Sequence, residues 1–140
     1  MPIITTLGFT GRTEEALDFY KNALGAKTTF LMRFRDCPDQ SQTKAGMEDM
    51  IFHATFEIEG TVFMASDVGW GENEEHGSFT GFSLAIRLGS VERAKKIFAA
   101  LSQKGRVVIP LEKSKFTSWY GIVVDQFGVS WKLNVDENES

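Results

Sequence analysis

The sequence predicts an α+β protein built from two tandem βαβββ modules. Short runs of β-branched and aromatic residues flank a helix-period segment, and this order of elements occurs twice along the chain. Tyr20 in the first helical segment recurs as Phe98, 78 residues later. The turn residue Gly60 recurs as Gly128, 68 residues later. Recurrence of corresponding residues in the same order along the chain is typical of a duplicated unit.

The first module is predicted to contain four strands and one helix. The strands are expected at residues 3–9, 28–35, 50–58 and 61–66. Thr13 is predicted to cap the helix, because acidic residues that favour the helix dipole follow it directly. Gly25 is predicted to end this helix. Residues 36–49 are predicted to form a loop, and Glu59-Gly60 a tight turn.

The second module repeats the pattern. Its strands are expected at residues 82–88, 107–109, 119–124 and 130–135. Ser90 is predicted to cap the helix and Gly105 to end it, with Ala94, Ile97, Phe98 and Leu101 on its buried face. Residues 125–128 form the matching hairpin turn. We expect a single domain over 1–140, with modules at 1–68 and 79–136 and a polar linker at 69–78.

The composition narrows the class of protein. Hydrophobic residues make up 42% of the chain, including twelve Phe, which is enough for a buried core. The net charge of −4 argues against a nucleic-acid or anionic-membrane binder, because both need a basic face. A single cysteine, Cys37, indicates no internal disulfide, and no apolar run reaches the roughly 20 residues that span a bilayer. The N-terminus has no signal-peptide pattern, so we expect a cytoplasmic protein.

Several ordered motifs resemble a known superfamily. The segment from Ala16 to Gly25, ALDFYKNALG, resembles the first-helix signature of the vicinal oxygen chelate superfamily. This superfamily includes glyoxalase I, bleomycin-resistance proteins, fosfomycin-resistance enzymes and extradiol dioxygenases. The segments 53–58, 63–67 and 125–131 narrow the resemblance to its PhnB-like group. Arg33-Phe34 before a Pro-containing loop and residues 116–121 also fit, so the resemblance runs from Ile3 to Val135.

The resemblance implies an architecture and partners. Each module would curl its mixed sheet into a half-barrel, and the two would enclose a ligand cleft with the helices outside. A homodimer is implied, since open sheet edges favour pairing. Members of the group are often described as 3-demethylubiquinone methyltransferase-like. The chain, however, has no glycine-rich turn between a strand and a helix where S-adenosylmethionine would bind.

The resemblance also implies a metal site that this chain does not match. Enzymes of the superfamily place His, Gln or Glu at four inward strand positions, where a divalent ion polarises the substrate. Counting from the motifs assigns these positions to Thr5, Met64, Ser83 and Lys132. A shift of one or two residues gives Ala65, Ser66 or Asn134 instead. None is His or Glu, and lysine opposes a cation, so we expect no metal and no cofactor.

His53, Lys132 and Trp119 are each candidate ligand contacts with a structural alternative. His53 is read as a cleft residue and a weak candidate for a general base, against a structural histidine. Lys132 alternates with Trp131 and Leu133, so it is read as an anchor for an anion, against a solvated face or dimer rim. Trp119, with Tyr120, is read as an aromatic wall, against core or dimer packing.

Other residues whose side chains could take part in binding or catalysis are given structural interpretations. Arg33 and Arg35 are expected on a solvated edge. Cys37 has no neighbouring histidine in the sequence and is expected to be an incidental thiol. The run at 72–76, ENEEH, carries metal donors but is read as a solvated linker.

Three functions remain open on the sequence alone. The first is a metal-free protein that binds a small flat or anionic molecule in the cleft. The second is a metal-dependent lyase, isomerase or dioxygenase-type enzyme with relocated ligands. The third is a structural or regulatory homodimer whose cleft is filled by its own side chains. Fold alone does not choose among them.

Overall fold

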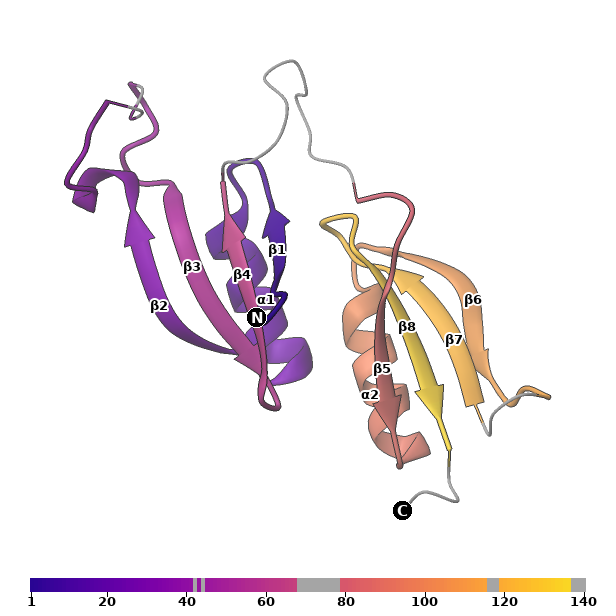
Figure 1. The fold of residues 1–140 in the computed structure, drawn as a ribbon. Helices are drawn as coiled ribbons and strands as arrows, with labels where there is room; N and C mark the ends of the chain where they lie inside the picture. The colour runs from indigo at the N-terminus through magenta and orange to yellow at the C-terminus, as the bar shows by residue number, and fades with distance from the viewer. Residues whose placement is uncertain (42, 44, 68–78, 116–118, 137–140) are drawn as a thin grey trace. The chain divides into compact units, whose positions relative to one another are not determined.

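A computed structural model describes residues 1–41, 43, 45–67, 79–115 and 119–136. The chain divides into two compact units, Met1–Gly77 and Ser78–Ser140. Each unit contains one βαβββ module, so the predicted α+β fold with tandem modules is confirmed (Figure 1). In the described ranges, no helix is long and apolar enough to cross a membrane.

The first module is a four-stranded mixed sheet with one long helix. Its elements are β1 (Thr5–Gly8), α1 (Thr13–Leu24), β2 (Lys27–Arg33), the short 3₁₀ helix η1 (Phe34–Asp36), β3 (Ile51–Ile58) and β4 (Thr61–Ser66). The strand order is β1-β4-β3-β2. Strand β1 runs parallel to β4, and the other neighbours are antiparallel.

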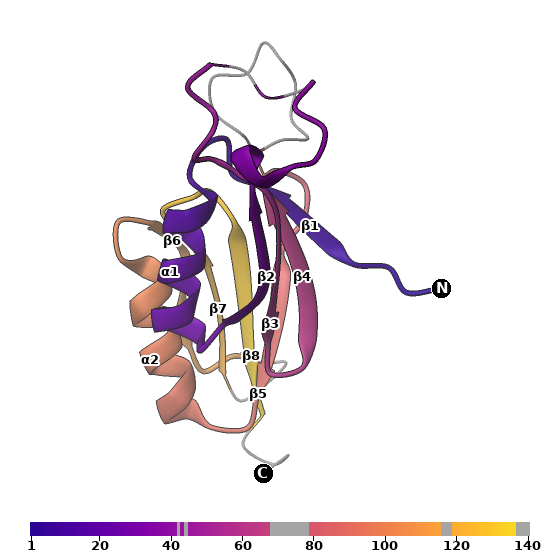
Figure 2. The ribbon, with the colours of Figure 1, turned by 90° about the vertical axis from the view of Figure 1, so that its left-hand side faces the viewer.

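The second module repeats this topology strand for strand. Its elements are β5 (Leu84–Leu88), α2 (Val91–Ser102), β6 (Arg106–Glu112), β7 (Trp119–Val124) and β8 (Ser130–Val135). The strand order is β5-β8-β7-β6, with β5 parallel to β8 and the rest antiparallel. In each module the helix runs along one face of its own sheet (Figure 2).

The two hairpin turns and three strands match the sequence prediction closely. Strands 61–66, 119–124 and 130–135 have the predicted bounds. Glu59 and Gly60 both have positive φ, at 47° and 89°, as a tight two-residue hairpin turn requires. Strand β6 is longer than predicted and continues through Pro110. Proline is tolerated there because β6 is an edge strand.

The helix ends differ in instructive ways from the prediction. Gly25 ends α1 in the left-handed conformation, with φ of 71°, as predicted. Helix α2 ends earlier than predicted, at Ser102, and the left-handed residue there is Lys104. Gly105 is needed for space instead. A Cβ at Gly105 would lie 2.3 Å from the carbonyl oxygen of Val124, so β7 leaves no room for a side chain.

The predicted cap of α1 is wrong. Thr13 is the first helical residue rather than the cap, and the cap position, Arg12, makes no side-chain cap hydrogen bond. The carboxylate of Asp67, at the end of β4, accepts hydrogen bonds from the backbone nitrogen of Thr13 at 3.0 Å and from its hydroxyl at 2.6 Å. The cap therefore comes from 54 residues away in the sequence. In α2, Ser90 caps locally by accepting from the nitrogen of Arg93, as predicted.

Each core lies between the helix and one face of its sheet. In the first module, Tyr20 of α1 is fully buried and its ring stacks on Phe56 of β3, which in turn stacks on Phe63 of β4. In the second module, the predicted apolar face of α2 is buried. A Cβ at Gly121 would lie 2.9 Å from the ring of Phe98, so glycine lets α2 pack directly on β7.

One bulge interrupts the strict alternation of side chains along β3. Arg33 pairs with Ile51 and Met32 pairs with His53, which leaves Phe52 as an extra residue on β3. Ile51 is therefore buried at 1% exposure on the helix side, whereas Phe52 is 37% exposed. Strict alternation along a strand would place Ile51 on the face of His53. Strict alternation fails because the bulge inserts one residue between them.

Candidate functional site

Each sheet has one face turned away from its own helix, which we call the helix-free face. Side chains alternate along a strand, and cross-strand partners share a face. In the second module, Trp131, Leu133 and Val135 of β8 are buried, so Ser130, Lys132 and Asn134 belong to the helix-free face. Among the residues predicted to bind a ligand, this rule shows which share a face.

Met64 and Lys132 occupy equivalent positions in the two modules. Met64 of β4 pairs with Thr6 of the parallel strand β1, and Lys132 of β8 pairs with Ala85 of β5. Thr5 lies on the other face of β1, because it alternates with Thr6 and shares a side with buried Leu7. Thr6 therefore accompanies Met64.

Thr6 and Ala85 occupy equivalent strand positions in the two modules. Their separation in the sequence is one residue longer than the 78 residues that separate equivalent positions of the two helices. The first module has one more residue between its first strand and its helix, in the turn at Thr10 and Gly11, both of which have positive φ. Counting back from the helix signature therefore reaches Thr5, one residue before the position that pairs with Met64. Whether Thr5 contacts a ligand stays a prediction.

His53 lies on the helix-free face of the first module. Its Nε2 is 3.2 Å from the hydroxyl of Thr55, and Thr55 pairs with Met64 across β3 and β4. The ring of Phe30 lies 5.9 Å from that of His53. This face is therefore mostly apolar and uncharged around His53. Lys27 and Glu57 are opposite each other in the register of β2 and β3, at the far end of the sheet.

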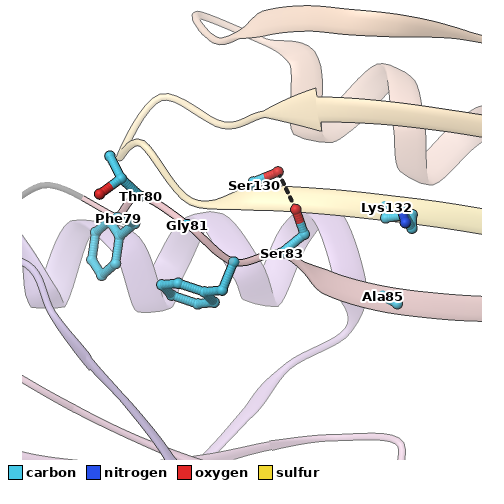
Figure 3. A pocket seen from close by; sticks show the side chains of 8 residues that line it. Phe79, Thr80, Gly81, Ser83, Ala85, Ser130 and Lys132 are labelled. Carbon is cyan, nitrogen blue, oxygen red and sulfur yellow. Dashed lines mark hydrogen bonds between the residues drawn. The ribbon is translucent and has the colours of Figure 1, made fainter.

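A pocket of about 580 Å³ opens on the helix-free face of the second module. It is lined by Phe79, Thr80, Gly81, Phe82, Ser83, Ala85, Ser130 and Lys132 (Figure 3). Two predicted ligand residues, Ser83 and Lys132, thus come together. The hydroxyl oxygens of Ser83 and Ser130 are 2.7 Å apart and share a hydrogen bond (Figure 3). Ser130 was not predicted, although strand alternation with Lys132 could have found it.

The lining of this pocket carries a positive charge and no negative one. None of its eight residues is Asp or Glu. The ammonium of Lys132 lies 5.6 Å from the ring centre of Tyr120 on β7, a cation–π arrangement. In the described ranges, Lys132 forms no salt bridge with a carboxylate. Among the residues that the structure describes, the pocket lining therefore offers an ammonium group and no carboxylate.

The two tryptophans of the module lie on the opposite, helix-facing side. Trp119 shares this side with Gly121 and Val123, and the ammonium of Lys95 on α2 lies 4.9 Å from its ring centre. Trp119 and Lys132 therefore lie on different faces of the sheet. Trp131 is 2% exposed, and its indole nitrogen donates to Asp125 at 2.8 Å, so Trp131 belongs to the core.

Two buried aspartates organise the loops, and sequence reasoning missed both roles. Asp67 is 4% exposed, and its carboxylate also accepts from the nitrogens of Gly11 and Ile51, both at 2.8 Å. Asp125 is 3% exposed, and its carboxylate accepts from the nitrogens of Phe127 and Val129. Each carboxylate is filled with protein donors, which indicates a structural role.

Arg33 and Arg35 lie on the surface in ion pairs. Arg33 donates to Glu14 of α1 and, at 2.7 Å, to the carbonyl oxygen of Asp49. The hydrogen bond from Arg33 lowers the pKa of the Glu14 carboxyl group and raises the pKa of the Arg33 guanidinium. Arg35 pairs with the carboxylate of Asp49. These pairs tie the predicted loop to α1 and fit the solvated-edge reading.

Cys37 lines a second, largely apolar pocket of about 320 Å³ in the first module. Its thiol contacts the carbonyl oxygen of Arg33 at 3.6 Å.

The run at 72–76, the linker 69–78 and residues 116–118 fall outside the described residues.

The groups at the equivalent strand positions are poor ligands for a divalent ion in either module. They are the thioether of Met64 and the hydroxyl of Thr6 in the first module, and the methyl of Ala85 and the ammonium of Lys132 in the second. Hard and borderline divalent ions prefer carboxylate and imidazole ligands, and an ammonium repels them. Within the described ranges, no group of three or more His, Cys, Asp or Glu residues could hold a metal ion.

Comparisons with known proteins agree with the geometry. The family model described as 3-demethylubiquinone-9 3-methyltransferase matches residues 1–134. Protein YjdN of Escherichia coli strain K12 is 30% identical over 143 aligned positions, covering 96% of this chain and 95% of that protein. The solved structure of a putative 3-demethylubiquinone-9 3-methyltransferase, PhnB protein, from Bacillus cereus is 29% identical. It has a TM-score of 0.80, with 96% of this chain and 99% of that chain covered.

A more distant structure shares the fold alone. It is a member of the glyoxalase/bleomycin resistance protein/dioxygenase superfamily from Sphaerobacter thermophilus. The identity is 19%, the TM-score is 0.58, and 97% of this chain and 98% of that chain are covered. On the family match and these relatives, the chain belongs to the 3-demethylubiquinone-9 3-methyltransferase family and is PhnB-like, and it shares the fold of the glyoxalase/bleomycin resistance protein/dioxygenase superfamily.

Proposed function

We propose that the protein binds a small anionic molecule with a flat apolar part, at the helix-free face of its second module and without a metal ion. The observation that carries this proposal is Lys132, which lies in a pocket whose lining contains no carboxylate. An ammonium group in a pocket lined by apolar side chains and by no carboxylate attracts anions.

The serine pair supports recognition of an anion. In the bond between Ser83 and Ser130 only one of the two hydroxyl protons is used. The other proton can donate to an oxygen atom of a ligand that enters the pocket. A hydrogen bond to a charged acceptor is about twice as strong as one to a neutral acceptor, so this arrangement favours a carboxylate over an amide.

Aromatic residues supply a surface for the flat part of the ligand. Phe79 and Phe82 line the same pocket, and Phe82 is 46% exposed. A planar ligand ring that covers an exposed phenyl ring gains both apolar burial and aromatic contact. An aromatic carboxylate is therefore the simplest probe of the proposed class.

Calorimetric titration with benzoate and with neutral benzamide tests the proposal. We expect wild type to bind benzoate more tightly than benzamide. Lys132→Gln is expected to weaken benzoate binding about tenfold or more, because a charge-assisted hydrogen bond contributes about 1.5–3 kcal/mol.

Lys96→Gln on the exposed side of α2 is the matched control, since it removes the same charge away from the pocket. Unchanged benzoate affinity in Lys132→Gln, with both variants folded by circular dichroism, would refute an anion site at Lys132. Equal affinity of wild type for benzoate and benzamide would refute the preference for anions.

The enzymatic alternative has less support from this geometry. His53 is the one candidate base from the sequence, and it contacts the hydroxyl of Thr55 and the ring of Phe30. A general base is ordinarily oriented by a carboxylate or a similar acceptor, and in the described ranges no carboxylate hydrogen-bonds to His53. Binding without chemistry is the function that the side chains support best.

We also propose that the protein forms a homodimer. Each sheet has an edge strand with exposed apolar side chains. These are Phe30 and Leu31 on β2, and Val107, Val108 and Ile109 on β6. Such edges are natural sites for pairing with a second chain. Light scattering after size exclusion should give twice the chain mass, and Val108→Lys should shift the mass toward the monomer. A monomeric mass at every protein concentration would contradict this proposal.

A further inference from the structure

A second cation lies on the same face as Lys132. Strand β5 pairs with β8 in parallel register, with Ala85 opposite Lys132 and Arg87 opposite Asn134. Arg87 alternates with Leu84, Ile86 and Leu88, which are less exposed, so its side chain belongs to the helix-free face. Arg87 and Lys132 are thus diagonal neighbours on adjacent strands.

The spacing of the two cations suits one small ligand. Adjacent strands lie about 4.8 Å apart and residues two positions along a strand about 6.6 Å apart, which puts the two backbones about 8 Å from each other. Both side chains are long and flexible, so their charged ends can approach a single molecule from two sides. A ligand with one anionic group at Lys132 therefore has a second cation within reach.

Neither Arg87 nor Lys132 forms a salt bridge with a carboxylate among the residues that the structure describes. Within those ranges, the salt bridges involve Arg12, Arg33 and Arg35, and none includes Arg87 or Lys132. The other charged residues near this side are Asp136, directly after β8, and Arg106 and Glu112 of β6, the opposite edge strand, which pair with Val124 and Tyr120. Within β5 and β8 themselves the face has two like charges and no carboxylate.

We propose that the ligand of this site is a dianion, such as a small dicarboxylate, with Arg87 as the residue that selects the second negative group. This inference rests on the proposed anion site at Lys132 and names the class of ligand that it binds. A monoanion offsets one of the two cations and leaves the other unpaired, whereas a dianion offsets both. Arg87 presents a planar fork of donors, which suits a carboxylate.

Terephthalate and its monoamide, 4-carbamoylbenzoate, test this inference because they share a shape and differ by one charge. By calorimetry, wild type is expected to bind terephthalate about tenfold more tightly than the monoamide. Arg87→Gln should remove that preference and leave affinity for the monoamide unchanged. Lys132→Gln should weaken binding of both probes.

Arg106→Gln is the matched control, since it removes an arginine from the same face at the distant edge strand. It should keep the preference for terephthalate. Equal affinity of wild type for the two probes, or a preference that survives in folded Arg87→Gln, would overturn the dianion inference and leave the anion site at Lys132 standing. No binding of either probe to wild type would overturn both.

Discussion

The two modules share one topology but differ in the chemistry of their helix-free faces. At equivalent positions, the first module has Met64 beside Thr6, and the second has Lys132 beside Ala85. Around Met64 the face carries neutral groups such as His53 and Thr55, whereas the face around Lys132 carries two cations. The same scaffold thus supports a mostly apolar surface in one copy and an anion-attracting surface in the other.

The modules also differ in how the helix start is held. Helix α1 is fixed from outside, by Asp67 at the end of β4 and by the ion pair between Glu14 and Arg33. Helix α2 is capped locally by Ser90. The duplicated topology therefore permits two solutions to the same problem, the unpaired backbone N–H groups of the first turn.

The largest effect is expected from breaking the long-range cap. Asp67→Ala removes the acceptor of four hydrogen bonds, from Gly11, from Ile51 and from the nitrogen and hydroxyl of Thr13. Because the donors of Thr13 and Ile51 are buried, we expect the free energy of unfolding to fall by about 3–5 kcal/mol in urea denaturation.

Ser90→Ala provides the matched comparison in the second module. Loss of a local side-chain cap costs about 1 kcal/mol. If the two substitutions cost the same, the proposed difference between a long-range and a local cap would be wrong.

A smaller effect is expected at the ion pair of the first module. The hydrogen bond from Arg33 lowers the pKa of Glu14 in the folded state, so its contribution to stability is present above the unfolded pKa of the carboxyl group. The contribution is lost as pH falls through the lowered folded pKa. Because the Glu14 side chain is 58% exposed, Glu14→Gln should cost only about 0.2–1 kcal/mol near neutral pH.

Urea denaturation of Glu14→Gln and wild type at neutral and acidic pH checks this sign. The difference in unfolding free energy should vanish in acid, below the folded pKa of Glu14. A difference that grows as pH falls would show that Glu14 is stabilising in its protonated form, contrary to the pKa direction.

Much of the fold was predictable because its signals are local. Glycine in a left-handed conformation ends α1, a positive-φ pair turns the β3–β4 hairpin, and the apolar period of α2 marks its buried face. The family assignment likewise follows from ordered short motifs spread along the chain. These features depend on neighbours within a few residues.

The site was only partly predictable because its geometry depends on register and long-range contacts. Ser83 and Lys132 share a pocket as their strand positions implied, but one extra residue in the first β–α turn misplaces Thr5 relative to Met64. The bulge at Phe52 moves Ile51 to the buried side of β3. The cap from Asp67 joins residues 54 positions apart and has no local signature.

The contrast between the two helix-free faces is the central claim, and an amide chemical-shift titration with benzoate tests it most directly. The account predicts that the largest shifts fall on Ser83, Ala85, Ser130 and Lys132, with little change at Thr6, Thr55 and Met64. Shifts centred on Met64 and Thr55, or no shifts on β5 and β8 at saturating benzoate, would contradict it.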